Sequence, residues 1–350
     1  MTKETWKIFS RSGGQHDKLD DIPPPPPWRR FGTNRKITPA DDLTQSRDMD
    51  AEATRAEPFI VSVEMELAVN TALYLRRPLL LTGKPGTGKS TLIAKVAHQL
   101  KLGPVLRWPI NSRSSVREGI YEYDAVGRLQ SAGEHGQPPS VDDYLTLGPL
   151  GTALAERERP RALLIDELDK SDLDFANDLL NLIEEGEYVI RELQRIAGSH
   201  KVRDFENNDV DVTNGKLCAQ FFPFVVMTSN GEREFPSAFQ RRCIRLSIAE
   251  PTTEDLIRIV ESHLDFSSAN RGAYATPDER AASKSVQTEI SALVDQFVED
   301  RRSQEMSTDQ LLNAVFLTVG VPHRTQRSFG TDELEEVKKI LYRSISGTVT

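Results

Sequence analysis

The chain has 350 residues, 38% hydrophobic and 28% charged, a composition typical of a globular protein with one large domain or two ordinary ones. Its 44 basic and 53 acidic residues give a net charge of -9, which argues against a nucleic-acid binder that depends on overall basic charge. Two cysteines exclude a disulfide framework, and no apolar stretch resembles a signal peptide or reaches the ~20 residues of a membrane span. We therefore expect a cytoplasmic protein.

Residues 1–45 are predicted to form a flexible, proline-rich tail. They are polar, and five consecutive prolines, Pro23–Pro27, favour an extended polyproline II spacer. Two interpretations remain open at this point. The run is either a docking peptide for a partner, or a tether whose Trp28 and Phe31 pack on the body of the protein.

Residues 46–250 are predicted to form an α/β core, and residues 251–350 a separate helical domain. In the core, short buried strands alternate with helices, which indicates a parallel sheet. After Glu250 the patterns are helical only. The expected core elements are a helix at 61–75, a strand at 78–83, a helix at 90–102, a strand at 104–111, a helix at 148–159, a strand at 161–170, a helix at 174–186, and strands at 221–230 and 243–248.

A phosphate-binding loop is predicted at "GKPGTGKS", which fits G-x-x-x-x-G-K-[ST] between a strand and a helix. Glycines let backbone N–H groups turn inward around phosphates, and the helix N-terminus adds partial positive charge. Lys89 supplies a full charge, and Ser90 supplies a hydroxyl for Mg²⁺. The predicted nucleotide-binding residues are Gly83, Lys84, Pro85, Gly86, Thr87, Gly88, Lys89, Ser90 and Thr91.

Polar residues follow the predicted strands at the edge where open α/β sheets bind ligands. Asp166 is predicted to bind the metal, and the adjacent Glu167 to deprotonate a water. Alone, the pair could equally be an acidic cap on the next helix. Asn230 is predicted to hold the attacking water or contact the γ-phosphate, and it also suits a turn before Gly231. A hydrogen bond from Asn111 to Glu167, holding that carboxylate inactive, is a further hypothesis.

These stretches together resemble the AAA+ ATPases. "LLLTGKPGTGKST" is similar to their Walker A motif, "LLIDELDK" to Walker B and "VVMTSN" to sensor 1. The segments "LTLGPL" and "TSNGEREFPSAFQRRCIRL" are similar to the MoxR branch, and the resemblance covers about residues 58–350. It implies an AAA+ P-loop NTPase core, an αβα sandwich with a parallel sheet and a helical lid. It also implies ATP, Mg²⁺, a hexameric ring, and two insertions, at 112–147 and near 187–220.

Adjacent arginines precede the last core strand. The resemblance implies that Arg242 is an arginine finger, which completes the site of a neighbouring subunit and accelerates phosphoryl transfer by ~10³–10⁵. The resemblance implies that Arg241 either assists Arg242 or pairs with an acid across the subunit interface. The alternative is a pair of surface salt-bridge arginines. Asp309 stands where many such lids carry a sensor 2 arginine, so either Arg301 or Arg302 substitutes for it, or the lid couples weakly to nucleotide.

Three functions are compatible with these motifs. The first is a chaperone-like ATPase that remodels a protein partner, for which the resemblance suggests a von Willebrand A domain protein. The second is a slow nucleotide-gated assembly switch in a multi-component defence or stress system. The third is a small-molecule kinase. The roles expected of Asn230 and Arg242, together with the helical lid, favour the first two functions over this one. Nucleic acid is not an expected partner.

Overall fold

The computed structural model describes residues 6–29, 56, 59–135, 139–155, 157–196, 198–264, 277–303, 306–321, 333, 336–337 and 340–341. The chain divides into two compact units. The larger unit comprises Met1–Glu57, Val61–Gly83 and Lys89–Ile248, and the smaller comprises Pro58–Ile60, Lys84–Gly88 and Ala249–Thr350.

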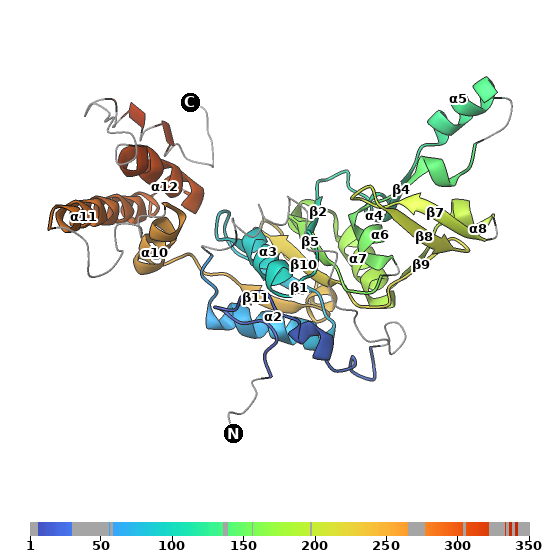
Figure 1. Cartoon of the computed structure of the whole chain (residues 1–350), viewed down its shortest axis with the longest axis horizontal. Coiled ribbons are helices and arrows are strands. Elements are labelled where there is room, and N and C mark those ends of the chain that lie inside the picture. Colours follow the sequence, from blue (N-terminus) through green and yellow to red (C-terminus); the bar gives the residue numbers. More distant parts are fainter. Residues whose placement is uncertain are drawn as a thin grey trace. The chain divides into compact units, whose positions relative to one another are not determined.

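A five-stranded parallel sheet forms the centre of the larger unit (Figure 1). Its strand order is β11-β1-β10-β5-β2, and β1, β5 and β10 are apolar and almost wholly buried, as expected for strands covered on both faces. The predicted parallel sheet with flanking helices is therefore confirmed. The strands are β1 (Leu79–Thr82), β2 (Leu106–Pro109), β5 (Ala162–Asp166), β10 (Phe224–Ser229) and β11 (Ile244–Ser247), and the helices include α2 (Val63–Leu75), α3 (Lys89–Gln99), α7 (Leu173–Glu185) and α9 (Ser237–Gln240).

A second sheet joins the two regions that were predicted as insertions. Its order is β3-β4-β7-β8-β9-β6, and β4 meets β7 in parallel at Thr146 and Arg203. Strands β7 and β8 alternate exposed and buried residues, so one face packs inward. The elements are α4 (Val116–Ile120), β3 (Tyr121–Tyr123), α5 (Ala125–His135), β4 (Leu145–Leu147), α6 (Pro149–Leu154), β6 (Glu187–Val189), α8 (Arg191–Gln194), β7 (Ser199–Arg203), β8 (Asp209–Thr213) and β9 (Lys216–Cys218). Region 112–147, which has no clear sequence pattern, thus contains regular structure.

Residues 6–29 differ from the flexible tail predicted for residues 1–45. Residues 6–22, which we call the N-terminal strap, end in the short helix η1 (Lys18–Asp21) and pack on the larger unit. Phe9 is fully buried and Leu19 is 2% exposed, so apolar contact holds the strap in place. The tether interpretation predicts that Trp28 and Phe31 pack on the body of the protein. Trp28 is 76% exposed, and Phe31 lies outside the described residues.

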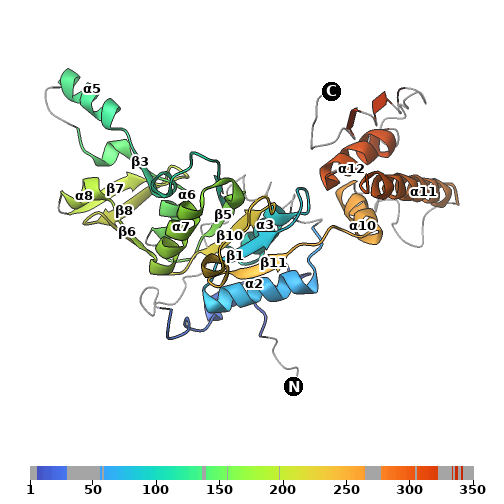
Figure 2. The ribbon, with the colours of Figure 1, turned by 180° about the vertical axis from the view of Figure 1, so that it is seen from behind.

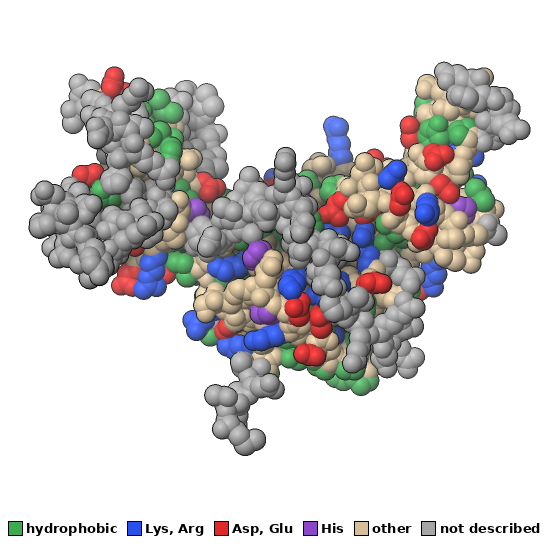
Figure 3. All heavy atoms as spheres, in the orientation of Figure 1, with side chains coloured by type: hydrophobic (Ala, Val, Ile, Leu, Met, Phe, Trp, Pro, Cys, Tyr) green, Lys and Arg blue, Asp and Glu red, His purple; other side chains and the backbone are tan. Residues whose placement is uncertain are grey.

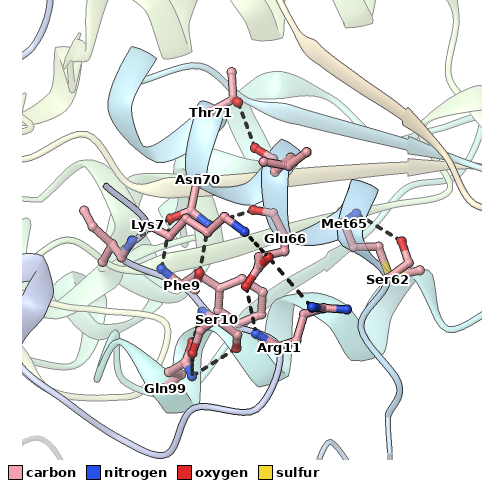
Figure 4. Close-up of polar contacts among 12 residues, drawn as sticks. Lys7, Phe9, Ser10, Arg11, Ser62, Met65, Glu66, Asn70, Thr71 and Gln99 are labelled. Atoms are coloured by element: carbon pink, nitrogen blue, oxygen red, sulfur yellow. Dashed lines mark hydrogen bonds and ion pairs between the residues drawn. The ribbon is translucent and has the colours of Figure 1, made fainter. Parts of the chain in front are cut away.

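Polar side chains of α2 and α3 bind the main chain of the strap (Figure 4). The side-chain oxygen of Asn70 accepts hydrogen bonds from the backbone N–H groups of Ile8 (2.7 Å) and Phe9 (3.0 Å). Gln99 of α3 accepts from the N–H of Ser10 at 2.9 Å. Glu66 pairs with Lys7 at 2.5 Å, and this hydrogen bond lowers the pKa of Glu66. The strap thus joins two helices of the core.

The smaller unit contains a helical bundle, as predicted for the C-terminal region. Its helices are α10 (Thr253–Leu264), α11 (Pro277–Asp300) and α12 (Thr308–Val315), which continues into a π-helical turn at Phe316–Gly320. Buried apolar side chains from all three helices form its own core, among them Leu256, Phe297 and Leu311. The bundle therefore has the interior that a separate domain needs.

One face of the molecule mixes both signs of charge among its described side chains. On the face drawn in Figure 3, described basic and acidic side chains lie interspersed, and Figure 2 gives the ribbon from the opposite side. Within the described ranges, no helix is long and apolar enough to cross a membrane.

Candidate active site

The loop between β1 and α3, residues 83–88, which we call the glycine loop, has the backbone that its glycines permit. Gly86 and Gly88 have φ values of 74° and 83°, which L side chains rarely adopt. A Cβ atom at Gly88 would lie 2.3 Å from the ring of Phe59, and one at Gly86 would lie 2.8 Å from Cβ of Ser307. Both positions therefore require glycine for conformation and for space.

Lys89, the first residue of α3, directs its ammonium group back toward this loop. Its Nζ atom donates to the carbonyl of Gly83 at 2.6 Å and to Oδ1 of Asn230 at 2.8 Å. The residue is 8% exposed, and desolvation by burial lowers its pKa, an effect that the charge of Asp166 opposes. The structure thus brings together Lys89 and Asn230, which are 141 residues apart in the sequence.

Ser90 and Asp166 face one another as a pair of oxygen donors. The Ser90 hydroxyl lies 3.4 Å from each carboxylate oxygen of Asp166. Hydroxyl and carboxylate oxygens are ligands that Mg²⁺ prefers, so these residues fit a magnesium ion. Thr228 orients the site, because its hydroxyl donates to Oδ1 of Asp166 and accepts from the N–H of Glu167 at 2.9 Å. The sequence reasoning missed Thr228, although it lies two residues before Asn230.

Glu167 is held by a neighbouring lysine. Its backbone is left-handed, with φ 59° and ψ 45°, and its carboxylate accepts from Nζ of Lys170 at 2.5 Å. The hydrogen bond predicted from Asn111 is not the one formed. The side-chain oxygen of Asn111 instead accepts from the N–H of Arg113 at 2.8 Å, which closes a turn in its own loop. The contact that restrains Glu167 therefore comes from three residues further along the chain.

A buried carboxylate joins the turn after β5 to the loop after β10. Asp169 is 4% exposed, and its Oδ2 accepts from the N–H groups of Asn230 (2.9 Å) and Glu232 (3.1 Å). Asn230 is thus positioned by two hydrogen bonds, one from its backbone N–H to Asp169 and one from Lys89 to its side-chain oxygen. Periodicity alone gives no signal for this role, because Asp169 lies in a short acidic stretch.

The two arginines lie between α9 and β11, where Arg242 forms contacts within its own chain. Its Nε atom lies 3.3 Å from Oε2 of Glu184, and its Nη1 donates to the side-chain oxygen of Asn181 at 3.0 Å. Oε1 of Glu184 also pairs with Arg29 at 3.0 Å. Arg241 is exposed. The contacts in one chain match the salt-bridge alternative, and the role of Arg242 in a neighbouring subunit stays a prediction.

Within the smaller unit, the N-terminus of α12 reaches the glycine loop. Ser307 caps this helix with a capping box and is the residue that Gly86 approaches. Asp309 lies in the first turn of α12, next to that contact. Arg301, one of the two candidates to replace a sensor 2 arginine, instead pairs with Glu250 at 3.1 Å.

The sequence profile of the "AAA domain (dynein-related subfamily)" matches residues 78–243. This range contains the glycine loop, both carboxylates, Asn230 and the arginine pair. Residues 78–243 are thus similar to an AAA domain. The fold of this chain is the AAA+ P-loop NTPase fold, with a helical region after it. The finer assignment to the MoxR branch rests on the sequence motifs alone.

No curated protein matches the chain. Among solved structures, a mutant of RuvB from Thermotoga maritima aligns with 15% identity and a TM-score of 0.40, covering 81% of this chain and 72% of that one. Domain III of the Thermotoga maritima replication initiation protein DnaA aligns with 13% identity and a TM-score of 0.38, covering 83% and 97%. These identities and TM-scores support no statement about function.

Proposed function

We propose that this AAA domain hydrolyses ATP with the help of Mg²⁺. The observation that carries the proposal is the meeting of Lys89, Asn230 and the Ser90–Asp166 pair at the carboxyl ends of adjacent strands, beside the glycine loop. When nucleotide binds, phosphate oxygens can replace the Gly83 carbonyl and the Asn230 side-chain oxygen as hydrogen-bond acceptors for the Lys89 ammonium. A buried cation at this place otherwise costs free energy.

Each residue has a distinct task in the proposed reaction. Backbone N–H groups of the glycine loop and the α3 N-terminus bind the phosphates, and Lys89 neutralises the β- and γ-phosphate charge. A magnesium ion, held by Ser90 and Asp166, would supply further charge neutralisation when bound. Glu167 accepts the proton of the attacking water, and the Asn230 amide orients that water.

The proposed use of this activity is to remodel or activate a protein partner, as a MoxR-type ATPase in a ring of identical subunits. The motifs around residues 145–150 and 228–246 support this choice, and a partner with a von Willebrand A domain follows from the same resemblance. The net charge of -9 supports a protein partner over a nucleic acid. A ring would place Arg242 at a neighbouring nucleotide.

A slow nucleotide-gated switch is the second candidate, and two contacts favour it. Glu167 is paired with Lys170, and Arg242 is paired with Glu184. Both residues must leave these partners before they act on a phosphate or a water. Hydrolysis would then be slow until a partner or a neighbouring subunit releases them.

Phosphate release from ATP, measured over an about hundredfold range of protein concentration, tests the proposal. We expect specific activity that rises with concentration, loss of nucleotide binding in Lys89→Ala, and binding without turnover in Glu167→Gln. Arg242→Ala should bind ATP and fail to hydrolyse it, while Arg245→Ala, which alters an exposed arginine of β11, serves as the matched control. Turnover by Glu167→Gln equal to the wild type would refute the assigned chemistry.

A further inference from the structure

An exposed loop of five prolines and a tryptophan, Pro23–Trp28, follows the strap; we call it the proline loop. Each proline fixes its own φ, and a residue before proline is restricted to extended backbone, so Pro23–Pro26 are extended by covalent structure alone. The run ends in a turn, because the N–H of Arg29 donates to the carbonyl of Pro26 at 2.8 Å. This turn places Trp28 at its tip.

Both ends of the proline loop are fixed to the larger unit. At the first end, Nη2 of Arg76 donates to the carbonyl of Pro23 at 2.7 Å, and Asp20 just before it pairs with Arg159 at 2.8 Å. At the other end, the side chain of Arg29 is 8% exposed and pairs with Glu184. The path of the loop is therefore set before any partner arrives.

Most side chains between these fixed ends are exposed, and those of Pro25 and Pro26 are half-buried. Pro23, Pro24 and Pro27 are exposed, and Trp28 is 76% exposed. Trp6, in the same N-terminal segment, is 50% exposed and rests edge-on against the ring of Tyr74 at 5.6 Å. An exposed tryptophan on a pinned loop gives up a large hydrophobic gain, which binding to a partner would recover.

We propose that the proline loop is a docking epitope for a protein partner whose groove is lined by aromatic side chains and reads polyproline II. Such grooves bind extended prolines because the ligand is already ordered and loses little conformational entropy. Pinning both ends lowers that entropic cost further, so the loop is a better ligand than the same residues in a free peptide. The epitope lies outside the nucleotide site, and its role goes beyond ATP hydrolysis.

The test is an NMR titration of isotope-labelled, isolated polyproline-reading domains of the SH3, WW and EVH1 types. Each domain is titrated with the unlabelled full chain, and separately with a blocked peptide of residues 20–29. We expect at least one domain to show shifts confined to its aromatic groove. Its affinity for the chain should exceed that for the peptide by about threefold or more, because the chain presents the loop already ordered.

Three variants locate the binding. Trp28→Ala should weaken it, whereas Trp6→Ala, which alters another exposed tryptophan of the same segment, should leave it unchanged. Arg29→Gln releases the far end and should lower the affinity to that of the free peptide while keeping the same groove shifts. Circular dichroism establishes that each variant is folded.

Several outcomes would overturn the proposal. One is the absence of groove shifts in all three domains. Another is binding by the peptide but not by the chain, which would mean that the folded chain keeps the loop from entering such a groove. Equal binding by Trp28→Ala would place the contact elsewhere. If the wild type instead self-associates in a concentration-dependent way that Trp28→Ala abolishes, the occupant is a second copy of the chain, and the aromatic-groove partner is wrong.

Discussion

Replacing Asn70 by alanine should destabilise the larger unit, because this one side chain satisfies four polar groups. Its oxygen accepts from the N–H groups of Ile8 and Phe9, and its nitrogen donates to the carbonyls of Phe9 (2.8 Å) and Glu66 (2.7 Å). Asn70 is fully buried. In Asn70→Ala, three main-chain groups of a strap that stayed in place would lose their partners. Each buried, unpaired group costs about 1–3 kcal/mol, so the expected loss is about 3 kcal/mol or more.

Detachment of the strap sets the upper limit of this loss. Phe9→Ala, which removes a fully buried ring, should by itself cost about 3–5 kcal/mol. If the strap detaches in both variants, both reach the same limit, namely the free energy with which the strap binds. The free energy of unfolding of the double variant Asn70→Ala/Phe9→Ala should then be no lower than that of the less stable single variant.

Urea denaturation followed by circular dichroism measures these losses, and hydrogen exchange at Ile8 and Phe9 reports detachment directly. Thr71→Ala is the matched control on the same helix, since the Thr71 hydroxyl donates to the Leu67 carbonyl of α2 itself. It should change the free energy of unfolding by less than about 0.5 kcal/mol. An Asn70→Ala protein as stable as this control, with Ile8 and Phe9 still protected from exchange, would refute the reasoning.

Other predictions concern the nucleotide site and the smaller unit. Lys170→Ala should raise basal phosphate release by about two- to fivefold, because a surface ion pair of up to about 1 kcal/mol no longer holds Glu167; unchanged release at equal ATP affinity would show that the pair does not restrain catalysis. The hydrogen bond from Lys84 holds the pKa of Glu250 below 4.5. The contribution of ionised Glu250 to the free energy of unfolding is thus present above pH 4.5 and is lost as the pH falls through the lowered pKa. The Tm of Glu250→Gln should fall less steeply with acid than that of the wild type, and parallel curves would count against it. Asp309→Arg should tighten ATP binding if this position faces the phosphates, and unaltered affinity and turnover would show that it does not.

Much of the candidate site could be predicted because its residues occupy positions with strong local rules. The glycine loop is one continuous motif between β1 and α3. Asp166 and Asn230 follow buried apolar runs, and parallel strands bring such ends to the same edge of a sheet. The pairing of β5 with β10 then places the carboxylate and the amide side by side. Apolar runs and a motif sufficed for this part of the fold.

The strap and the contacts of the arginine pair could not be predicted in this way. Phe9 binds Asn70 across 61 residues through main-chain atoms, which leave no pattern of side chains. Glu184 lies in the last turn of α7 among other acidic residues, and nothing in its neighbourhood identifies Arg29 as a partner 155 residues away. Long-range polar contacts of this kind depend on tertiary geometry, whereas periodicity reports only which face of an element is apolar.

The second sheet was hidden for a related reason. Its strands are three to five residues long, and the link between its two parts is the single pairing of Thr146 with Arg203. Short strands with alternating exposure resemble polar loops when they are read without their partners.

The way in which Asn70 holds the strap has an evolutionary consequence. Because its amide recognises the backbone of Ile8 and Phe9, many substitutions in the strap leave those hydrogen bonds intact, provided that the backbone keeps its path. Selection would then act strongly on one asparagine of α2 and weakly on most residues of the strap. Homologous proteins could keep the same strap after their N-terminal sequences have diverged beyond alignment.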